Sequence, residues 1–399
     1  MQDAIPAIQT RSWLLYGLLA LVAMSFSATG PVTIVMAAAG QAGLSLGQTS
    51  SWLFAVFAIN GVGSLIISWF TRQPMVFFWT LPGTVLIAPM VVHYGFGAVV
   101  GTYLTCAVVM LVLGLTRWIV VVDRWVPMPV VMAMICGLFL KYALAILHST
   151  LSAPWIGASM LVAFFGLVAL ERRHARLRIP PILGAMVAGA VVMVCGGLQL
   201  SGMPSGAGLA TPLWQWPQFN LHCELELLVP LLITMIFVQN AQGIAVMRAA
   251  GYPASLRLIT VASGVLTALC APFGGAPSVL AGPCNAILVS DGSKGQHYKG
   301  ALLVGVLSVL IGVFASAFAY LLNHLPPAYI AVLAGLAMFG VLEKSFVSAF
   351  SSPLPLSALV VFVVTLSDIT LLGIGSAFWG VVAGCLVAYS AEQQKAAVA

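Results

Sequence analysis

The chain has 399 residues, of which only 6% are charged and 61% are hydrophobic. Soluble domains carry about 25% charged residues, because charges keep a surface solvated. The composition therefore excludes a soluble enzyme, a nucleic-acid-binding protein and a disordered chain. It predicts an all-α polytopic membrane protein whose surface mostly faces lipid. The net charge of +6 does not indicate nucleic acid, because basic residues in membrane proteins mainly record orientation.

Hydropathy divides the chain into fourteen predicted transmembrane segments, since a membrane-spanning helix needs roughly 20 apolar residues. The segments are placed at 13–37, 50–70, 76–92, 97–116, 126–147, 153–170, 180–200, 226–247, 257–273, 277–290, 300–322, 327–343, 355–371 and 374–391.

The positions of the basic residues test this division. If the N-terminus is cytoplasmic, every Lys and Arg except Lys141 falls on the cytoplasmic side. The positive-inside rule favours such an asymmetry, so both termini are predicted to be cytoplasmic. Lys141 lies towards the other side, where it either pairs with Asp368 or extends its ammonium group to the interface.

Similar stretches recur in the two halves of the chain. Residues 129–138 and 327–336 share Pro, Ala, Gly and Leu at the same spacing, and residues 187–192 resemble 382–387. Because each half would hold seven segments, the second half would enter the membrane from the opposite side. The pattern predicts a 7+7 inverted repeat, which is typical of secondary transporters with a site at mid-membrane.

The third and tenth segments are interrupted by Pro and Gly near their middles. Proline lacks an N–H group and favours the first turn of a helix, so we expect an extended stretch followed by a half-helix in each. The half-helices would begin near Pro82-Gly83 and Gly282-Pro283. Their N-termini would meet at mid-membrane and form an anion site without a buried cation. The alternative is that these residues only kink ordinary helices.

Polar and aromatic residues at the same depth are the candidate substrate ligands. The amides of segment eight either line the substrate cavity or join helices by hydrogen bonds, and the aromatic residues beside the first break either stack on a substrate or pack. No catalytic constellation, metal motif or cofactor motif is present, and no carboxylate lies near mid-membrane. The predicted substrate-binding residues are Ser25, Ser27, Thr29, Phe78, Trp79, Thr80, Pro82, Gly83, Thr84, Gln239, Asn240, Gln242, Ser278, Gly282, Cys284 and Asn285.

Two stretches carry a family resemblance. Residues 238–252 (VQNAQGIAVMRAAGY) and 372–384 (LGIGSAFWGVVAG) resemble signatures of the benzoate membrane transport family. That family comprises carriers of the bacterial inner membrane, regarded as proton symporters of benzoate. Its architecture is similar to that of nucleobase/ascorbate and sulfate-permease-type carriers.

The resemblance implies a division into a core domain and a gate domain that move against each other. The core would comprise residues 13–116 and 226–322, and the gate residues 117–200 and 327–391. Short β-strands would lead into the half-helices of segments three and ten, and a homodimer is a common form among these relatives.

Nucleobase carriers place a carboxylate at about the position of Gln239, and a neutral amide there suits an anionic substrate better. The sequence therefore predicts a secondary active transporter that imports benzoate or a related aromatic carboxylate, with protons, through the lipid bilayer. A nucleobase carrier, an inorganic-anion carrier and an anion channel of the same fold remain as alternatives.

Overall fold

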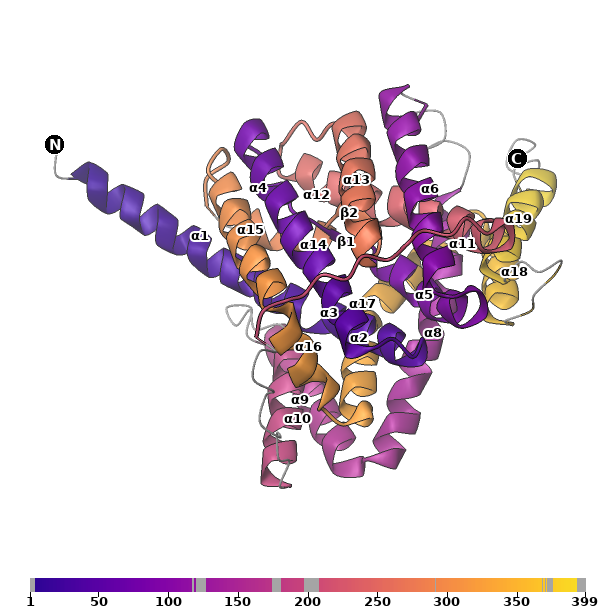
Figure 1. The fold of residues 1–399 in the computed structure, drawn as a ribbon, viewed down its shortest axis with the longest axis horizontal. Helices are drawn as coiled ribbons and strands as arrows, with labels where there is room; N and C mark the ends of the chain where they lie inside the picture. Colours follow the sequence, from indigo (N-terminus) through magenta and orange to yellow (C-terminus); the bar gives the residue numbers. More distant parts are fainter. Residues whose placement is uncertain are drawn as a thin grey trace.

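The computed structural model describes residues 4–116, 118–119, 127–173, 181–196, 208–290, 292–367, 369, 371 and 376–392. Within these ranges the chain is almost entirely helical (Figure 1). Asp368 and residues 372–375 lie outside them, and so does the predicted pairing of Asp368 with Lys141.

The helices of the first half are α1 (Ala4–Ala28), α2 (Gly30–Gln41), α3 (Leu46–Phe54), η1 (Ala55–Ile59), α4 (Asn60–Thr71), α5 (Leu81–Tyr94), α6 (Phe96–Leu115), α8 (Met128–Ser152), α9 (Pro154–Arg173) and α10 (Pro181–Cys195). Those of the second half are α11 (Leu221–Ile233), η2 (Thr234–Asn240), α12 (Ala241–Ala249), α13 (Leu256–Cys270), η3 (Ala271–Phe273), α14 (Gly282–Leu288), α15 (Tyr298–Val313), α16 (Ala315–Asn323), α17 (Pro327–Phe350), α18 (Pro355–Leu366), α19 (Ser376–Val387) and η4 (Ala388–Glu392).

Eight helical stretches among the described residues are long and apolar enough to cross a membrane, or nine if the bent pair of α15 and α16 is counted. That pair is bent by 71°. Four further apolar helices are shorter: α5, α10, α18 and the stretch from Ser376 to Ala391. Helix α14, in the tenth predicted segment, has only seven residues. The protein is thus a helical polytopic membrane protein in which several predicted segments hold short or interrupted helices.

The interruptions come from identifiable causes. Helices α1 and α2 are separated at Thr29, directly before Gly30 and Pro31, which open α2. Proline fixes its own φ and disfavours the helical conformation of the residue before it. In two other stretches the helix widens without breaking, at the π-helical segments η1 and η2. Such π-helical turns occur frequently at functional sites.

Two three-residue strands lie at the centre of the molecule (Figure 1). Strand β1 (Phe77–Trp79) pairs antiparallel with β2 (Ser278–Leu280), with Phe78 opposite Val279. They occupy the third and tenth predicted segments and lead into α5 and α14, as the sequence predicted. Both strands are completely buried, which is tolerable at membrane depth only if their backbone groups are hydrogen-bonded within the protein.

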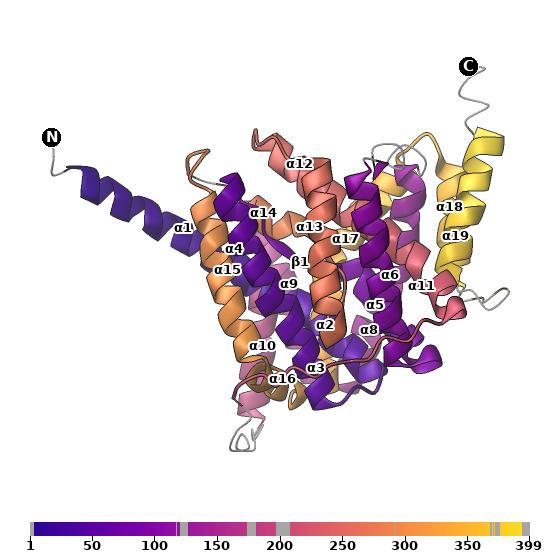
Figure 2. The same ribbon diagram turned by 45° about the horizontal axis from the view of Figure 1, so that its top comes forward.

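The helices form two sets that pack mainly within themselves. Helices α4, α6, α13 and α15 stand side by side in Figure 2, where α15 packs on α4 and α13 on α6. A second set consists of α8, α9, α10, α17, α18 and α19, with α8 packed along α17 and α18. Helix α5 packs on α6, and α2 packs on α5, so both belong to the first set; strand β1 packs on α4, and β2 packs on α13 and η2. The sets meet where α17 contacts α2 and where α8 contacts α5 and η2. The strands therefore lie in the first set, close to its boundary with the second.

An extended segment, residues 208–220, runs across the first set before α11 begins. Its backbone donates hydrogen bonds to three separate elements: Ala210 N to Val313 O at 2.7 Å, Gln215 N to Pro272 O at 2.7 Å, and Gln218 N to Gly97 O at 2.9 Å. A side chain at Gly101 would collide with the backbone of Gln218. The segment thus ties α6, η3 and α15 together at one face.

Candidate functional site

A small cavity lies where β1 and β2 enter their half-helices. Its volume is about 30 Å³, which is close to the space that one water molecule occupies in the liquid. An aromatic acid enters such a space only when the walls move. Elements α1, α2, β1, α5, η2 and α14 form the walls, with lining residues Phe26, Ser27, Pro31, Phe78, Trp79, Leu81, Gln239, Ala281, Pro283 and Cys284.

Five of the predicted substrate-binding residues line this cavity. They are Ser27, Phe78, Trp79, Gln239 and Cys284. Five other lining residues were not predicted, namely Phe26, Pro31, Leu81, Ala281 and Pro283. The sequence pointed to Pro31 and Pro283, because Pro31 follows the predicted Thr29 by two residues and Pro283 stands between the predicted Gly282 and Cys284. The others are ordinary apolar residues whose position only the fold reveals.

The predicted residues outside the lining are placed in several different ways. Ser25 is half-buried, and Thr29, Thr80, Pro82, Gly83, Thr84, Ser278 and Gly282 are buried near the cavity. Gln242 is exposed, and its side chain lies against Gly282. Asn240 and Asn285 are almost completely buried and turn towards the strands.

The two asparagines hold the strand backbones. Asn285 Oδ1 accepts a hydrogen bond from Val76 N at 3.0 Å, and its Nδ2 donates to Val76 O at 3.3 Å. Asn240 Oδ1 accepts from Leu280 N at 2.8 Å, while its Nδ2 donates to Ser263 Oγ at 3.2 Å. Buried polar groups of the backbone are costly unless they are paired, so these amides stabilise the strands that shape the cavity.

Hydroxyl groups on neighbouring helices complete this support. Ser64 Oγ accepts from Phe77 N at 2.8 Å, and Thr267 Oγ1 accepts from Ser278 N at 2.9 Å. Ser278 Oγ donates to Asn60 Oδ1 at 2.7 Å. Sequence reasoning did not assign Ser64, Asn60 or Thr267 a role, because their partners lie on other elements and are set by tertiary contacts.

Two aromatic residues of the lining, Phe78 and Trp79, pack against Phe57, which is fully buried and does not line the cavity. The Phe57 ring lies edge-on to Trp79 at 5.2 Å and to Phe78 at 5.8 Å between centroids, and Phe78 and Trp79 are 5.7 Å apart. Edge-to-face pairs at such separations stabilise a fixed ring orientation. The Nε1–H of Trp79 is buried, and no described residue accepts a hydrogen bond from it. An indole can only donate, so the lining residue Trp79 holds a buried donor that has no partner among the described residues.

The half-helix N-termini differ in their caps. Thr80 precedes α5, and its Oγ1 accepts a hydrogen bond from Gly83 N at 3.2 Å. Ala281 precedes α14 and provides no side-chain cap. Each helix has a proline in its first turn, which removes one N–H group. None of the described residues that line the small cavity is Asp, Glu, Lys, Arg or His, so among them an anion would be held by neutral donors.

Comparison with known proteins identifies the family. A family model described as benzoate membrane transport protein matches residues 10–389. The chain belongs to the benzoate membrane transport family. Like the other members of this family it is a membrane transport protein and not an enzyme.

Two relatives align with this family member over most of their length. The inner membrane protein YdcO of Escherichia coli (strain K12) is 30% identical over 356 residues, which are 88% of this chain and 89% of that protein. The benzoate membrane transport protein of Acinetobacter baylyi is 26% identical over 379 residues, which are 94% of each chain.

Solved structures show a related fold at low sequence identity. The structure of SLC26A9 superposes with a TM-score of 0.62 at 13% identity, over 93% of this chain but only 64% of that chain. The transmembrane domain of the cyanobacterial bicarbonate transporter BicA superposes with a TM-score of 0.57 at 14% identity, over 95% of this chain and 98% of that one. This member of the benzoate membrane transport family therefore shares their fold.

Proposed function

We propose that the protein is a secondary active transporter that imports benzoate or a related aromatic carboxylate together with protons. The observation that carries the proposal is the composition of the small cavity. Two aromatic rings, a neutral amide and an unused indole donor meet at the starts of two half-helices. The name of the Acinetobacter baylyi relative, which aligns over nearly the whole chain, supports benzoate as the substrate.

Each part of the substrate has a partner in this arrangement. The Gln239 amide and the Trp79 N–H would donate hydrogen bonds to the carboxylate. Phe78 would cover the aromatic ring. Since no acidic residue lines the cavity, the substrate meets no like charge, which would otherwise cost free energy in a site with little water.

Transport requires the small cavity to widen, and the two helix sets suggest how. In our proposal the fourteen segments form a 7+7 inverted repeat, with a core domain at 13–116 and 226–322 and a gate domain at 117–200 and 327–391. The cavity lies close to the boundary between the two sets. Movement of one set against the other would therefore change its shape.

The same proposal places the protein in a bacterial inner membrane with both termini cytoplasmic. The described basic residues other than Lys141 support this orientation: for example, Arg72 follows α4 and Arg248 ends α12, whereas His93 and Glu226 lie at the opposite ends of their spans. In Figure 2 the end of α19 nearest the C-terminus points to the upper edge, and α1 runs out to the left with its N-terminal end higher than its other end. The name of the Escherichia coli relative agrees with an inner membrane, and we expect a homodimer.

Uptake of labelled benzoate into proteoliposomes tests the function. We expect saturable uptake that an inwardly directed proton gradient accelerates, and counterflow of labelled benzoate when the vesicles are loaded with unlabelled benzoate. Absence of uptake by the wild-type protein would refute the carrier. Large unitary currents without counterflow would identify an anion channel instead.

A carrier of small inorganic anions is the second candidate, because the cavity of about 30 Å³ is closer in size to such an ion than to benzoate. Bicarbonate, sulfate and uracil should therefore be added as competitors. Strong inhibition by bicarbonate or sulfate with none by benzoate would favour the inorganic anion, and inhibition by uracil would favour a nucleobase.

A further inference from the structure

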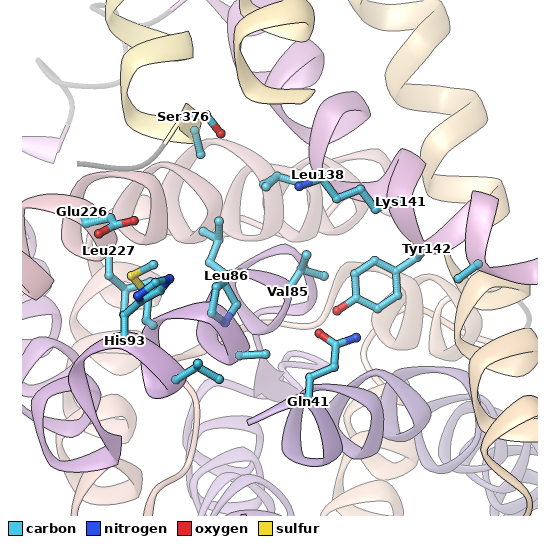
Figure 3. Close-up of a pocket in the computed structure, with 16 residues that line it drawn as sticks. Gln41, Val85, Leu86, His93, Leu138, Lys141, Tyr142, Glu226, Leu227 and Ser376 are labelled. Carbon is cyan, nitrogen blue, oxygen red and sulfur yellow. The ribbon is translucent and has the colours of Figure 1, made fainter. Parts of the chain in front are cut away.

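The basic residues of the described ranges differ in what surrounds them. Lys141 lines a cavity of about 600 Å³ between the two helix sets, with Glu226 at its other end (Figure 3), and it already takes part in an interaction. Arg72 and Lys299 instead lie at the ends of α4 and α15 that face the cytoplasm in the proposed orientation. No carboxylate of the described residues forms an ion pair with either of them, and both lie against aromatic rings.

The Arg72 guanidinium lies against two aromatic side chains. Its Cζ is 4.6 Å from the centroid of the Trp69 ring and 4.9 Å from that of the Tyr298 ring. Trp69 belongs to α4 and Tyr298 opens α15, and these two helices pack against each other. Cation–π contacts hold the guanidinium by its charge and leave its N–H groups able to donate to an anion.

The backbone of Arg72 gives a second observation. With φ 55° and ψ 27° it is left-handed, and within the described ranges it is the one residue other than glycine with a positive φ. Glycine ends a helix in this conformation at low cost, whereas a residue with a side chain is strained. Such strain is typical of functional positions. The side chain of Arg72, and not its backbone, is therefore what this position requires.

Lys299 makes the same kind of contact with a third helix. Its Nζ is 4.9 Å from the centroid of the Trp13 ring on α1 and donates a hydrogen bond to Gln296 Oε1 at 3.3 Å. Helix α15 packs on α1 as well as on α4. A cation in the first turn of a helix is unfavourable to the helix dipole, whereas an anion there is stabilised. The stability of α15 therefore does not explain Lys299, but an anionic ligand would.

An exposed apolar surface continues along the same three helices. Its large side chains, each with 46% to 80% of its surface exposed, include Leu18, Leu21, Val62, Ile66, Phe70 and Val306. On a membrane-spanning helix such side chains face acyl chains. Trp13 and Trp69 are about half exposed, and tryptophan is typical of the membrane–water interface. The two cations therefore lie where lipid headgroups meet the hydrocarbon.

We propose that the ends of α1, α4 and α15 form a binding site for an anionic phospholipid of the cytoplasmic leaflet. Arg72 and Lys299 bind the headgroup phosphate, and Trp13 and Trp69 pack against the glycerol region. The exposed apolar side chains contact the acyl chains. Basic sites between membrane-spanning helices on the cytoplasmic side suit such headgroups. The lipid ties three helices together and stabilises them, a role that does not depend on which substrate is transported.

Thermal unfolding of the full chain in a neutral maltoside detergent tests the site. We expect dioctanoyl phosphatidylglycerol to raise the apparent melting temperature in a saturable way. Dioctanoyl phosphatidylcholine at the same concentration should have little effect, because its ammonium group is repelled by the two cations. Sodium phosphate at the same concentration should also have little effect, because it lacks the acyl chains.

Two variants and a control locate the effect. Lys299→Gln should raise the phosphatidylglycerol concentration for the half-maximal shift about fivefold, and combining it with Arg72→Gly should raise it about twenty-fivefold. Glycine suits the left-handed turn, so the double variant should fold. Arg248→Gln removes an exposed charge from the end of α12 and should behave like the wild type. Native mass spectrometry should detect a phosphatidylglycerol adduct that the double variant lacks.

Four results would overturn the lipid site. The first is an equal half-maximal concentration for the wild type and the double variant, and the second is an equal shift with phosphatidylcholine. A shift with sodium phosphate would identify a site for free anions instead. Conversion of a dimer to a monomer by the substitutions without added lipid would show that a second copy of the chain covers this surface. If the double variant does not fold, Lys299→Gln alone decides, and an unchanged half-maximal concentration there refutes the site.

Discussion

The starts of α5 and α14 are built from the same parts but differ in what they leave available. Each follows a three-residue buried strand and carries a proline in its first turn. At α5, Thr80 accepts the hydrogen bond of Gly83 N, so this start is closed by its own residue. At α14, Ala281 offers no such acceptor. Two helix starts of similar construction therefore need not perform the same task.

Because of this difference, the two helix starts have different roles at the small cavity in our proposal. In the proposed site, Trp79 supplies a side-chain donor from the β1 side, and the uncapped first turn of α14 lies across the cavity beside Cys284. In this proposal the α5 start would contribute shape, and the α14 start would contribute hydrogen-bonding capacity. Four substitutions, taken in order of expected effect, test this division.

Asn285→Leu should have the largest effect. It removes both hydrogen bonds to Val76 and leaves the buried Val76 N–H unpaired, while Val76 O keeps the hydrogen bond from Ala281 N at 2.9 Å. We expect a loss of about 2 kcal/mol in stability and a fall of about 3 °C in the apparent melting temperature in detergent. Gln242→Leu, at an exposed amide, should change the melting temperature little. Equal melting temperatures for both variants would show that α14 does not hold β1.

Gln239→Glu should abolish most transport without unfolding the protein. The change places a negative charge in the small cavity that Gln239 lines, where it would repel a substrate carboxylate. We expect the benzoate concentration for half-maximal uptake to rise at least about tenfold. Gln242→Glu adds the same charge outside the cavity and should leave it nearly unchanged. Undiminished transport by Gln239→Glu would contradict a carboxylate at this position.

Thr80→Val should remove the cap of α5 while it keeps the volume of the side chain. Valine keeps the shape but loses the acceptor for Gly83 N and the contact with Thr234 Oγ1 at 3.3 Å. Loss of an N-cap costs about 1 kcal/mol, which thermal unfolding in detergent can detect. Thr80→Ser keeps the oxygen and should remain close to the wild type. If valine and serine were equally stable, α5 would not depend on its cap.

Ala281→Ser should have the smallest effect and the opposite sign on stability. A hydroxyl at this position can cap α14 and stabilise it by about 0.5 kcal/mol. In doing so it occupies a first-turn N–H group, so benzoate affinity should fall about twofold. Ala281→Gly offers no acceptor and serves as the control in both assays. Unchanged affinity in Ala281→Ser would show that the substrate does not use the α14 start.

The sequence predicted the breaks well because proline and glycine act locally. Pro82 and Pro283 fall in the first turns of α5 and α14, as expected from the missing N–H group. The strands before them were implied by the family resemblance and lie at the predicted place. Composition likewise led to a helical membrane protein, since so few charges cannot cover a soluble surface.

The direction in which each polar side chain points was not predictable in the same way. Gln239 and Gln242 are three residues apart and would share a face of a regular α-helix. Gln239, however, belongs to the π-helical η2, which changes the angle between them, and only Gln239 lines the cavity. Asn240 and Asn285 resemble substrate ligands in the sequence but hold strand backbones, because their partners are set by tertiary contacts.

The side chains that hydrogen-bond to the two strand backbones have a consequence for how substrate specificity can change within the family. Ser64, Asn240, Thr267 and Asn285 hold the backbone of β1 and β2 and the residues beside them. These backbone hydrogen bonds therefore do not depend on the side chains that β1 presents to the cavity. Replacing Phe78 or Trp79 can alter which molecule is accepted while these four side chains still hold the strand backbones. New specificities are therefore accessible through single substitutions.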